Sequence, residues 1–367
     1  MGNRLASCMN TPLTRVSLAA LLALCALALA RCAPSPADDD QQTVVLYSSV
    51  DSAILREVVR AFEADTGLRV LVQDDTEATK TTGLVVRLLA ERDEPRADVW
   101  WSSEPFGTEQ LADAGALAPY TSEAAESYAG GAWPAGARDP DARWYGLAVR
   151  SRVFVYSPSR VDTPPTTLRE LTAEPWRGRV GMARPAFGTT RGHMAWLSER
   201  WGEDELRAWG EAMRANDLRL YDGNATVVRK VAEGEIDVAL TDTDDVLVGL
   251  RNGWDVAMAF EAVEDPTSPG AERWTSPGPM SIATTVGLVE GSRRAEAGKI
   301  LIDWLLTGNA ERLLAQSENG HRPVIDAAAE RPDWPGAPAA LVSPDIDAAA
   351  EAMPGAIEAI SQALGEG

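Results

Sequence analysis

The chain has 367 residues, of which 55 are acidic and 34 basic, and its formal net charge is −21. So acidic a surface repels phosphate groups, which argues against nucleic acid and anionic lipid headgroups as partners. The three cysteines are Cys8, Cys25 and Cys32. The chain beyond them therefore has no disulfide, no thiolate metal site and no Cys nucleophile, and it is long enough to bury a core without such a staple.

The first 31 residues are typical of an export signal. Arg4 and Arg15 precede an apolar run over 16–30, which is shorter than the ~20 apolar residues that span a bilayer. Leu29-Ala30-Arg31-Cys32 is similar to a bacterial lipobox, although Arg31 stands where that pattern has a small residue. We expect cleavage before Cys32 and a lipid on its thiol; ordinary cleavage after Ala30 is the alternative. Both routes export the protein to the periplasm or cell envelope.

Strand and helix signals alternate from residue 43 onward. An apolar run at 43–49, an amphipathic helix at 52–66 closed by Gly67, and a run at 68–73 predict a right-handed βαβ unit. A helix at 84–91 and a strand at 98–101 follow. Ligands bind outside the carboxyl ends of strands in such sheets, and polar residues stand at these ends. They are Ser48, Ser49, Asp51, Ser103 and Glu104.

The helix–turn–strand pattern of residues 85–104 recurs at residues 227–245. Both helices contain Val-Val-Arg and a later Ala-Glu, and both strands end in polar residues. Chance is the alternative, because five matching residues are a weak signal. Two distant strand ends of this kind predict two lobes that face one cleft, the second bringing Asp242, Asp244 and Asp245. Adjacent strand residues face opposite sides, so we expect Trp101 to border this cleft.

The segment between the two copies contains a hinge and a candidate anion site. The extended run at 144–156 is long enough to cross between lobes, and we expect 256–260 to form the return crossing. Gly188-Thr189-Thr190 begin a predicted helix, whose free N–H groups and dipole favour an anion. Ordinary capping by Thr189 is the alternative. Asn224 begins a further helix and is expected nearby.

These elements predict an α/β fold with two lobes, discontinuous domains and hinge strands. A strand at 278–288 and a helix at 294–305 would return to the first lobe, because a chain that crosses twice leaves that lobe in two segments. The expected division is a signal peptide at 1–31, an acidic tether at 32–42, a first lobe at 43–146 plus about 262–325, a second lobe at 147–261, and a C-terminal helical tail at 326–367 packed on the second lobe.

Several segments resemble the ferric-iron class of periplasmic solute-binding proteins, which serve ABC importers. They are Tyr47-Ser48-Ser49, Glu77 to Leu84, Ala97 to Trp101, Gly188-Thr189-Thr190, Gly234 to Leu240 and Gly278 to Glu290. The similarity extends over residues 43–320. It implies a type II fold of two lobes that close around a ligand, an ABC transporter permease as partner, and a monomeric binding protein.

The resemblance also implies a cargo site with altered ligands. The Tyr-Tyr pair that binds Fe(III) in the family corresponds to Asp244 and Asp245, and a family His corresponds to Asp51. A family acidic ligand corresponds to Glu104 or, with an offset of one residue, to Ser103. The helix start that holds a companion anion corresponds to residues 188–190. Carboxylates are hard donors suited to iron, manganese, magnesium or calcium rather than zinc or copper.

The expected sites follow from these correspondences. The expected metal ligands are Asp51, Glu104, Asp244 and Asp245, and the expected ligand contacts are Ser48, Ser49, Trp101, Ser103, Gly188, Thr189, Thr190, Asn224 and Asp242. No cofactor is expected apart from a metal ion, iron, as cargo. Without the Tyr pair the choice of cargo is open, and a small organic solute with a phosphate or phosphonate group is the alternative, for example an aminophosphonate or a sugar phosphate.

Other classes of function have weaker support in the sequence. No nucleophile elbow, zinc-hydrolase motif or phosphate-binding loop is present, so we expect no enzymatic activity. An exported glycosidase that uses Glu104 and Asp244 is the enzymatic alternative. A membrane-tethered sensor that passes its ligand to a receptor is not separable from an importer component by sequence. His193 and His321 have no partner at chelating spacing and are expected to be structural.

Overall fold

The computed structural model describes residues 42–75, 81–127, 133–268, 272–325 and 332–366. The export signal, Cys32 and the tether lie outside the described residues, as do residues 326–331 of the predicted tail. Residues 44–367 form one compact unit. Among the described helices, none has the length and apolar character needed to cross a membrane.

The strands lie in the order β2-β1-β3-β10-β5-β8-β6-β7. The first-lobe part contains β1 (Thr43–Ser48), β2 (Arg69–Asp74), β3 (Val99–Ser102), β4 (Leu117–Ala118), β10 (Ser281–Val289), β11 (Arg322–Pro323) and the first half of β5 (Tyr145–Tyr156). Its helices are α3 (Ser52–Thr66), α4 (Thr82–Ala90), α5 (Phe106–Asp113), α6 (Glu123–Glu126), α11 (Ala295–Leu306) and α12 (Asn309–Gln316), with a 3-10 turn η1 (Ala135–Ala137).

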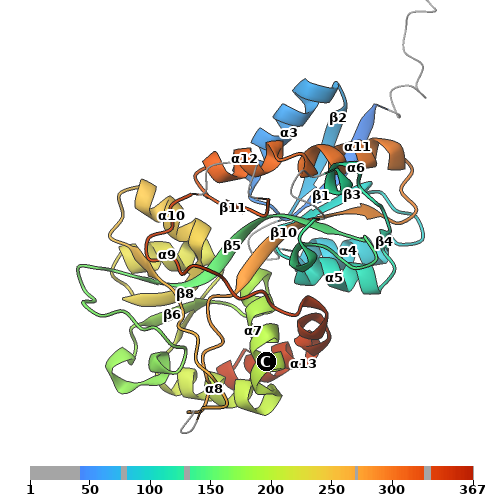
Figure 1. The fold of residues 1–367 in the computed structure, drawn as a ribbon. Coiled ribbons are helices and arrows are strands. Elements are labelled where there is room, and N and C mark those ends of the chain that lie inside the picture. Colours follow the sequence, from blue (N-terminus) through green and yellow to red (C-terminus); the bar gives the residue numbers. More distant parts are fainter. Residues whose placement is uncertain (1–41, 76–80, 128–132, 269–271, 326–331, 367) are drawn as a thin grey trace, which may run out of the picture. The chain divides into compact units, whose positions relative to one another are not determined.

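The second-lobe part is built around the other half of β5. Its strands are β6 (Val180–Ala183), β7 (Arg219–Tyr221), β8 (Val238–Asp242) and β9 (Ala257–Ala259). Its helices are α7 (Gly188–Trp201), α8 (Glu203–Ala215), α9 (Asn224–Ala232), α10 (Thr243–Arg251) and α13 (Ile346–Leu364), with 3-10 turns η2 (Glu170–Thr172) and η3 (Glu174–Trp176). Helix α13 packs against α7 and α8 and also touches α5 (Figure 1).

The predicted βαβ unit at the start of the fold is confirmed to within a residue at each boundary. Helix α3 buries Ile54, Val58 and Phe62 on one face, the 3.6-residue spacing that an amphipathic helix requires. It ends at Gly67, whose φ of 73° is a left-handed conformation that glycine adopts without strain. Burial of each such apolar side chain contributes about 1.5–3 kcal/mol. The unit thereby fixes the carboxyl end of β1.

The prediction that Trp101 borders the cleft is wrong. All four residues of β3 are buried, because β3 lies between β1 and β10 and both faces of the sheet are covered. Trp101 packs in the core with Val44 and Leu46. Trp100 packs on the opposite face, where its indole N–H donates to Thr108 Oγ1 at 2.8 Å.

The first crossing strand is as predicted, but the return crossing is not. Strand β5 pairs with β10 up to Ser151 and with β8 from Arg152 onward, so it passes from one group of strands to the other at this point. The run at 256–260 forms β9, which pairs only with the second half of β5. The chain instead returns along β10, which begins opposite Ser151 and lies beside β5 in Figure 1.

The repeated pattern in the sequence corresponds to a repeated structure. Helix α4 leads to β3 and helix α9 leads to β8, and each strand ends in polar residues. Both strands pair in parallel with a neighbour, β3 with β1 and β8 with β6. We call residues 102–104 after β3 the first strand tip and residues 242–245 after β8 the second strand tip.

Candidate functional site

The first strand tip is held by hydroxyl groups. Ser48 Oγ donates to the carbonyl of Trp101 at 2.8 Å, and Ser49 Oγ accepts the N–H of Ser103 at 3.0 Å and the hydroxyl of Thr81 at 3.1 Å. All of these groups are buried. Ser48 and Ser49 therefore fix the tip from behind, and of the residues predicted on this side only Asp51 and Ser103 line the cavity described below.

Glu104 is directed away from the cavity and toward the start of α5. Its carboxylate accepts the N–H of Phe106 at 2.7 Å and that of Gly107 at 3.0 Å, the first two groups of the helix that have no partner within it. Burial raises the pKa of Glu104 above its ordinary value, although Arg191 and these two N–H groups oppose the change. The expectation that Glu104 is a metal ligand disagrees with this arrangement, because its oxygens are engaged by the helix.

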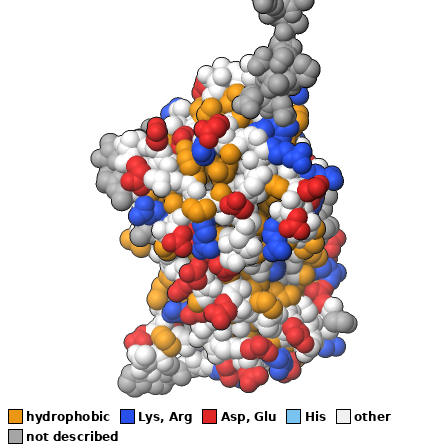
Figure 2. Space-filling view, turned by 90° about the vertical axis from the view of Figure 1, so that its right-hand side faces the viewer, with side chains coloured by type: hydrophobic (Ala, Val, Ile, Leu, Met, Phe, Trp, Pro, Cys, Tyr) orange, Lys and Arg blue, Asp and Glu red, His pale blue; other side chains and the backbone are white. Residues whose placement is uncertain are grey.

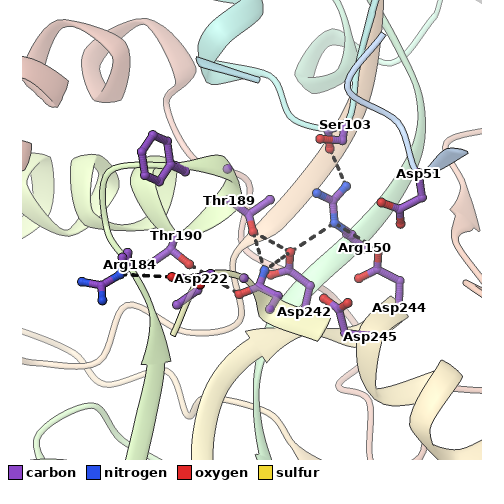
Figure 3. A pocket seen from close by; sticks show the side chains of 15 residues that line it. Asp51, Ser103, Arg150, Arg184, Thr189, Thr190, Asp222, Asp242, Asp244 and Asp245 are labelled. Atoms are coloured by element: carbon purple, nitrogen blue, oxygen red, sulfur yellow. Dashed lines mark hydrogen bonds and ion pairs between the residues drawn. The ribbon is translucent and has the colours of Figure 1, made fainter. Parts of the chain in front are cut away.

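The second strand tip brings three carboxylates together. Asp242 ends β8, and Asp244 and Asp245 lie in the first turn of α10. One oxygen of each can be chosen so that all three lie within 4.8 Å of one another. Asp51 lines the same cavity from the first lobe, where Asn319 Nδ2 donates to its carboxylate at 3.1 Å. Four of the predicted acidic residues are thus side by side (Figure 3).

Two arginines of β5 accompany these carboxylates, and the sequence argument did not identify them. Arg150 Nε lies 3.3 Å from Asp242 Oδ2 and 3.6 Å from Asp244 Oδ2. Arg152 Nη1 donates to Asp242 Oδ1 at 2.8 Å. Both arginine side chains are buried. The signal that could have revealed them is their spacing, because two arginines two residues apart in an apolar strand lie on the same face.

The arginines determine the ionisation of this group. Burial alone would raise the pKa of Asp242, but the positive charges of Arg152 and Arg150 outweigh burial and lower it. Burial alone would lower the pKa of Arg150. The negative charges of Asp244, Asp242 and Asp51 outweigh burial and raise this pKa. Asp242 is therefore ionised and Arg150 protonated at neutral pH.

The start of α7 forms the opposite wall of the cavity. Thr189 Oγ1 donates to Asp242 Oδ2 at 2.6 Å, and Asn224 Nδ2 donates to Thr189 Oγ1 at 2.9 Å. No side chain of the residue before the helix caps it. Residues 188–190 line the cavity, so the amino end of α7, with the positive end of the helix dipole, lies beside it. Arg184 stands at the rim beside Asp222, with its Nε 3.3 Å from Asp222 Oδ1.

The cavity joins residues from both lobes and is small. Its volume is about 40 Å³, room for about three water-sized groups at ~10–15 Å³ each. The predicted residues that line it are Asp51, Ser103, Gly188, Thr189, Thr190, Asn224, Asp242, Asp244 and Asp245. Arg150, Arg184, Phe187 and Asp222 also line it (Figure 3). Ser48, Ser49, Trp101 and Glu104 do not.

The charges around the cavity are unequal. Five aspartates and two arginines line it, and Arg152 pairs with Asp242 from behind. When every carboxyl group is ionised, these five carboxylates outnumber the three arginines by two, and Arg184 also pairs with Glu366. His321 Nε2 lies 3.8 Å from Asp244 Oδ2, so this histidine, which was expected to be structural, is near the site.

Comparison with known proteins identifies the family of the chain. A family model described as bacterial extracellular solute-binding protein matches residues 95–346. The chain belongs to this family. "Iron uptake protein A1" of Synechocystis sp. is 27% identical over 288 residues, which are 78% of this chain and 77% of that protein. A "Putative 2-aminoethylphosphonate-binding periplasmic protein" of Salmonella typhi is 26% identical over 255 residues, 65% of this chain and 69% of that protein.

Solved structures confirm the predicted fold class. Iron-bound HitA from Pseudomonas aeruginosa superimposes with a TM-score of 0.72 at 21% identity, covering 86% of this chain and 99% of HitA. A ferric binding protein from Campylobacter jejuni gives 0.73 at 18% identity, with 87% and 99% covered. The two-lobed α/β architecture and the resemblance to periplasmic solute-binding proteins of the ferric-iron type are both confirmed. The lobe boundaries by residue number and the roles of individual residues stay predictions.

Proposed function

We propose that the protein is the extracellular solute-binding component of an ABC importer and that its cargo is ferric iron held together with a small companion anion. The observation that carries this proposal is the group of Asp51, Asp242, Asp244 and Asp245 around one small cavity. Carboxylate oxygens are the donors that hard cations prefer. The relative in Synechocystis sp. named for iron uptake supports the choice of metal.

Charge balance and size support a metal ion with an anion. A trivalent cation with one singly charged anion brings a net charge of +2, which offsets the excess of carboxylates over arginines in the cavity wall. The N-terminus of α7 and Arg184 offer N–H donors for the anion on the side away from Asp244 and Asp245. A volume of about 40 Å³ matches an ion with a small anion better than a sugar.

A second candidate cargo is an aminophosphonate. The relative in Salmonella typhi named for 2-aminoethylphosphonate supports it, and the cavity has acidic residues on one side and the α7 N-terminus on the other. In this arrangement Asp244 and Asp245 would bind the ammonium group, and Thr189 and Thr190 the phosphonate. Such a zwitterion leaves the excess negative charge of the wall unbalanced, so we favour iron.

The decisive experiment is native mass spectrometry of the purified protein with metal analysis, followed by calorimetry. Ferric nitrilotriacetate and 2-aminoethylphosphonate are titrated separately into metal-free protein. We expect one iron per chain and no measurable heat with the phosphonate. Tight binding of the phosphonate without metal binding would overturn the iron proposal.

The spectrum of the loaded protein gives an independent check. Among the described residues that line the cavity there is no tyrosine. Iron bound there has no phenolate ligand, and we expect no visible phenolate-to-iron charge-transfer band. A coloured iron complex would mean that a tyrosine from elsewhere enters the site.

We also propose that the protein is exported, anchored by a lipid on Cys32, and monomeric, with a transporter permease as its partner. The export signal pattern and the family support this. Figure 2 shows acidic and basic side chains interspersed on one face, so a lipid is a better anchor than a basic surface. Cys32→Ala should move the protein from the membrane fraction to the soluble fraction, and a native N-terminus at Arg31 without lipid would contradict the proposal. Native mass spectrometry reports the oligomeric state.

The position of Glu104 argues against the alternative that the protein is a glycosidase. A glycosidase needs two free carboxyl groups facing the same bond. Glu104, one of the predicted pair, is engaged by the N–H groups of α5. A binding protein therefore fits the arrangement better, and the absence of turnover on aryl glycosides is the expected result.

A further inference from the structure

Arg150 is placed where a cation would bind. Its guanidinium lies within 3.3–3.6 Å of carboxylate oxygens of Asp242 and Asp244, the group that otherwise has the composition of a metal site. A guanidinium carries a permanent positive charge and donates hydrogen bonds to carboxylates. It therefore neutralises these carboxylates in the way that a bound metal cation would. The side chain is 5% exposed, so water does not screen these interactions.

The two arginines of β5 have different relations to the site. Arg152 forms an ion pair with Asp242 and donates to Asn224 Oδ1 at 3.4 Å, so it holds the wall of the cavity from behind. Arg150 lines the cavity and lies within ion-pair distance of Asp244. Arg152 is not paired with Asp244. Asp242 therefore keeps a counter-ion when Arg150 moves, whereas Asp244 loses one.

Arg150 also has a second partner outside the acidic group. Its Nη1 donates to the backbone carbonyl of Ser103 in the first strand tip. A guanidinium has five N–H donors in a fixed plane, so it keeps this bond while its Nε edge leaves Asp244. Displacement from the carboxylates therefore does not leave the buried charge without a partner.

We propose that Arg150 is a built-in competitor for the cation subsite, which the cargo must displace from Asp244 before it binds; this inference rests on the proposed binding of a metal cation. The displacement costs the same free energy for every cation, so it lowers all cation affinities by a common factor. Weakly bound divalent ions then fall below useful affinity, while a trivalent ion, which gains more from each carboxylate, stays above it. Arg150 in this sense sets the affinity that any cation must exceed, without changing the ratio of affinities between cations.

The test compares the metal-free wild-type protein with Arg150→Met, which removes the charge and keeps much of the length. Ferric nitrilotriacetate, gallium nitrilotriacetate, manganese chloride and calcium chloride are titrated by calorimetry or competition. We expect the variant to bind each metal about tenfold more tightly or better, since one unit charge at this distance is worth at least that factor. Manganese binding should become measurable in the variant. Arg150→Gln is the second variant if the Met protein is poorly folded.

Arg160→Met is the matched control. Arg160 is also paired with a carboxylate, with its Nε 2.8 Å from Asp237 Oδ1, but it does not line the cavity. Metal affinities should stay within about threefold of wild type in this control. A second readout is thermal: the metal-free Arg150→Met protein should have a lower Tm than wild type, and gallium should raise that Tm by more than it does in wild type.

The outcomes separate the two proposals. If wild type binds metal and both Arg150 variants bind it with the same or lower affinity, the proposed role of Arg150 is overturned. The iron proposal then stands. Metal binding by the Arg150 variants alone would support the role of Arg150 and overturn iron as the natural cargo. Metal binding by neither protein would overturn both, and loss of 2-aminoethylphosphonate binding in Arg150→Met would then identify Arg150 as a contact of an anionic cargo.

Discussion

The two strand tips arise from the same helix–turn–strand pattern but use their carboxylates in different ways. At the first tip, Glu104 turns back to the N–H groups of its own helix. At the second tip, Asp242, Asp244 and Asp245 face the cavity and the arginines of β5. The first carboxylate is therefore balanced by backbone dipoles and the second group by full charges. Carboxylate side chains after corresponding strands thus hold a helix start in one lobe and pair with arginines in the other.

The largest effect is expected for the innermost carboxylate of the second tip. Asp242→Asn leaves Arg150 and Arg152 buried without their shared counter-ion, and breaking a buried ion pair from one side costs about 3–5 kcal/mol. Urea denaturation should show this loss in the free energy of unfolding. Asp204→Asn, at a carboxylate with 96% exposure, is the control and should change it by less than about 0.5 kcal/mol. A loss below about 1 kcal/mol in Asp242→Asn would mean that the arginines find other partners.

The next effect concerns cargo affinity rather than stability. Asp245→Asn removes a carboxylate that lines the cavity at intermediate exposure, and the affinity for ferric iron should fall about tenfold to a hundredfold, or ~1.4–2.8 kcal/mol. Competition titration against nitrilotriacetate measures it. Glu104→Gln is the matched change at the first tip and should leave the affinity within about threefold. Equal losses in the two variants would erase the distinction between the tips.

A smaller effect is expected when the first tip loses its carboxylate. Glu104→Ala deprives α5 of an acceptor for two of its first N–H groups, and such losses cost about 1 kcal/mol. Chemical denaturation near pH 4.5 isolates this contribution, because the charge of Glu104 matters least there. A stability equal to that of wild type would indicate that water replaces the carboxylate.

The smallest effect is in the pH dependence of stability. The pKa of Glu104 is raised by burial above its ordinary value of 4.5, so the folded protein holds this proton more tightly than the unfolded chain does. Its contribution to stability therefore declines as pH rises above 4.5 through the folded-state pKa. Asp242, whose pKa is lowered, acts in the opposite sense and loses its contribution as pH falls below 3.8. Denaturation of Glu104→Gln between pH 4 and 8 should show a flatter profile than wild type, and an unchanged profile would contradict the assignment.

Local patterns in the sequence were sufficient for much of the fold. Helix α3 was predicted at its observed bounds, because apolar spacing and the stop at Gly67 are local signals. Helices α5 and α8 were not predicted. The return crossing was assigned to 256–260 rather than to β10, because strand pairing depends on partners far away in the sequence and an apolar run does not identify them.

The sequence was sufficient to predict several residues of the candidate site, but not the directions in which their side chains point. Asp51, Asp244 and Asp245 line the cavity as expected, since strand ends collect there. Glu104 and Trp101 point elsewhere, because a carboxylate near a helix start competes for N–H groups and a strand covered on both faces buries every residue. Arg150 was not predicted as a site residue. It lies inside an apolar run that was interpreted only as a hinge.

Strand β5 changes its pairing partners between Ser151 and Arg152, so the two arginines of the site flank the point where the chain leaves one group of strands for the other. For protein engineering this separates two sets of positions. Arg150 and Arg152 lie on the crossing strand itself, whereas Asp244, Asp245 and Arg184 line the cavity from outside this strand. In a biosensor built on this scaffold, the ligand specificity should be changed by substitutions at those three positions. Strand β5, which connects the two lobes, should be left unchanged.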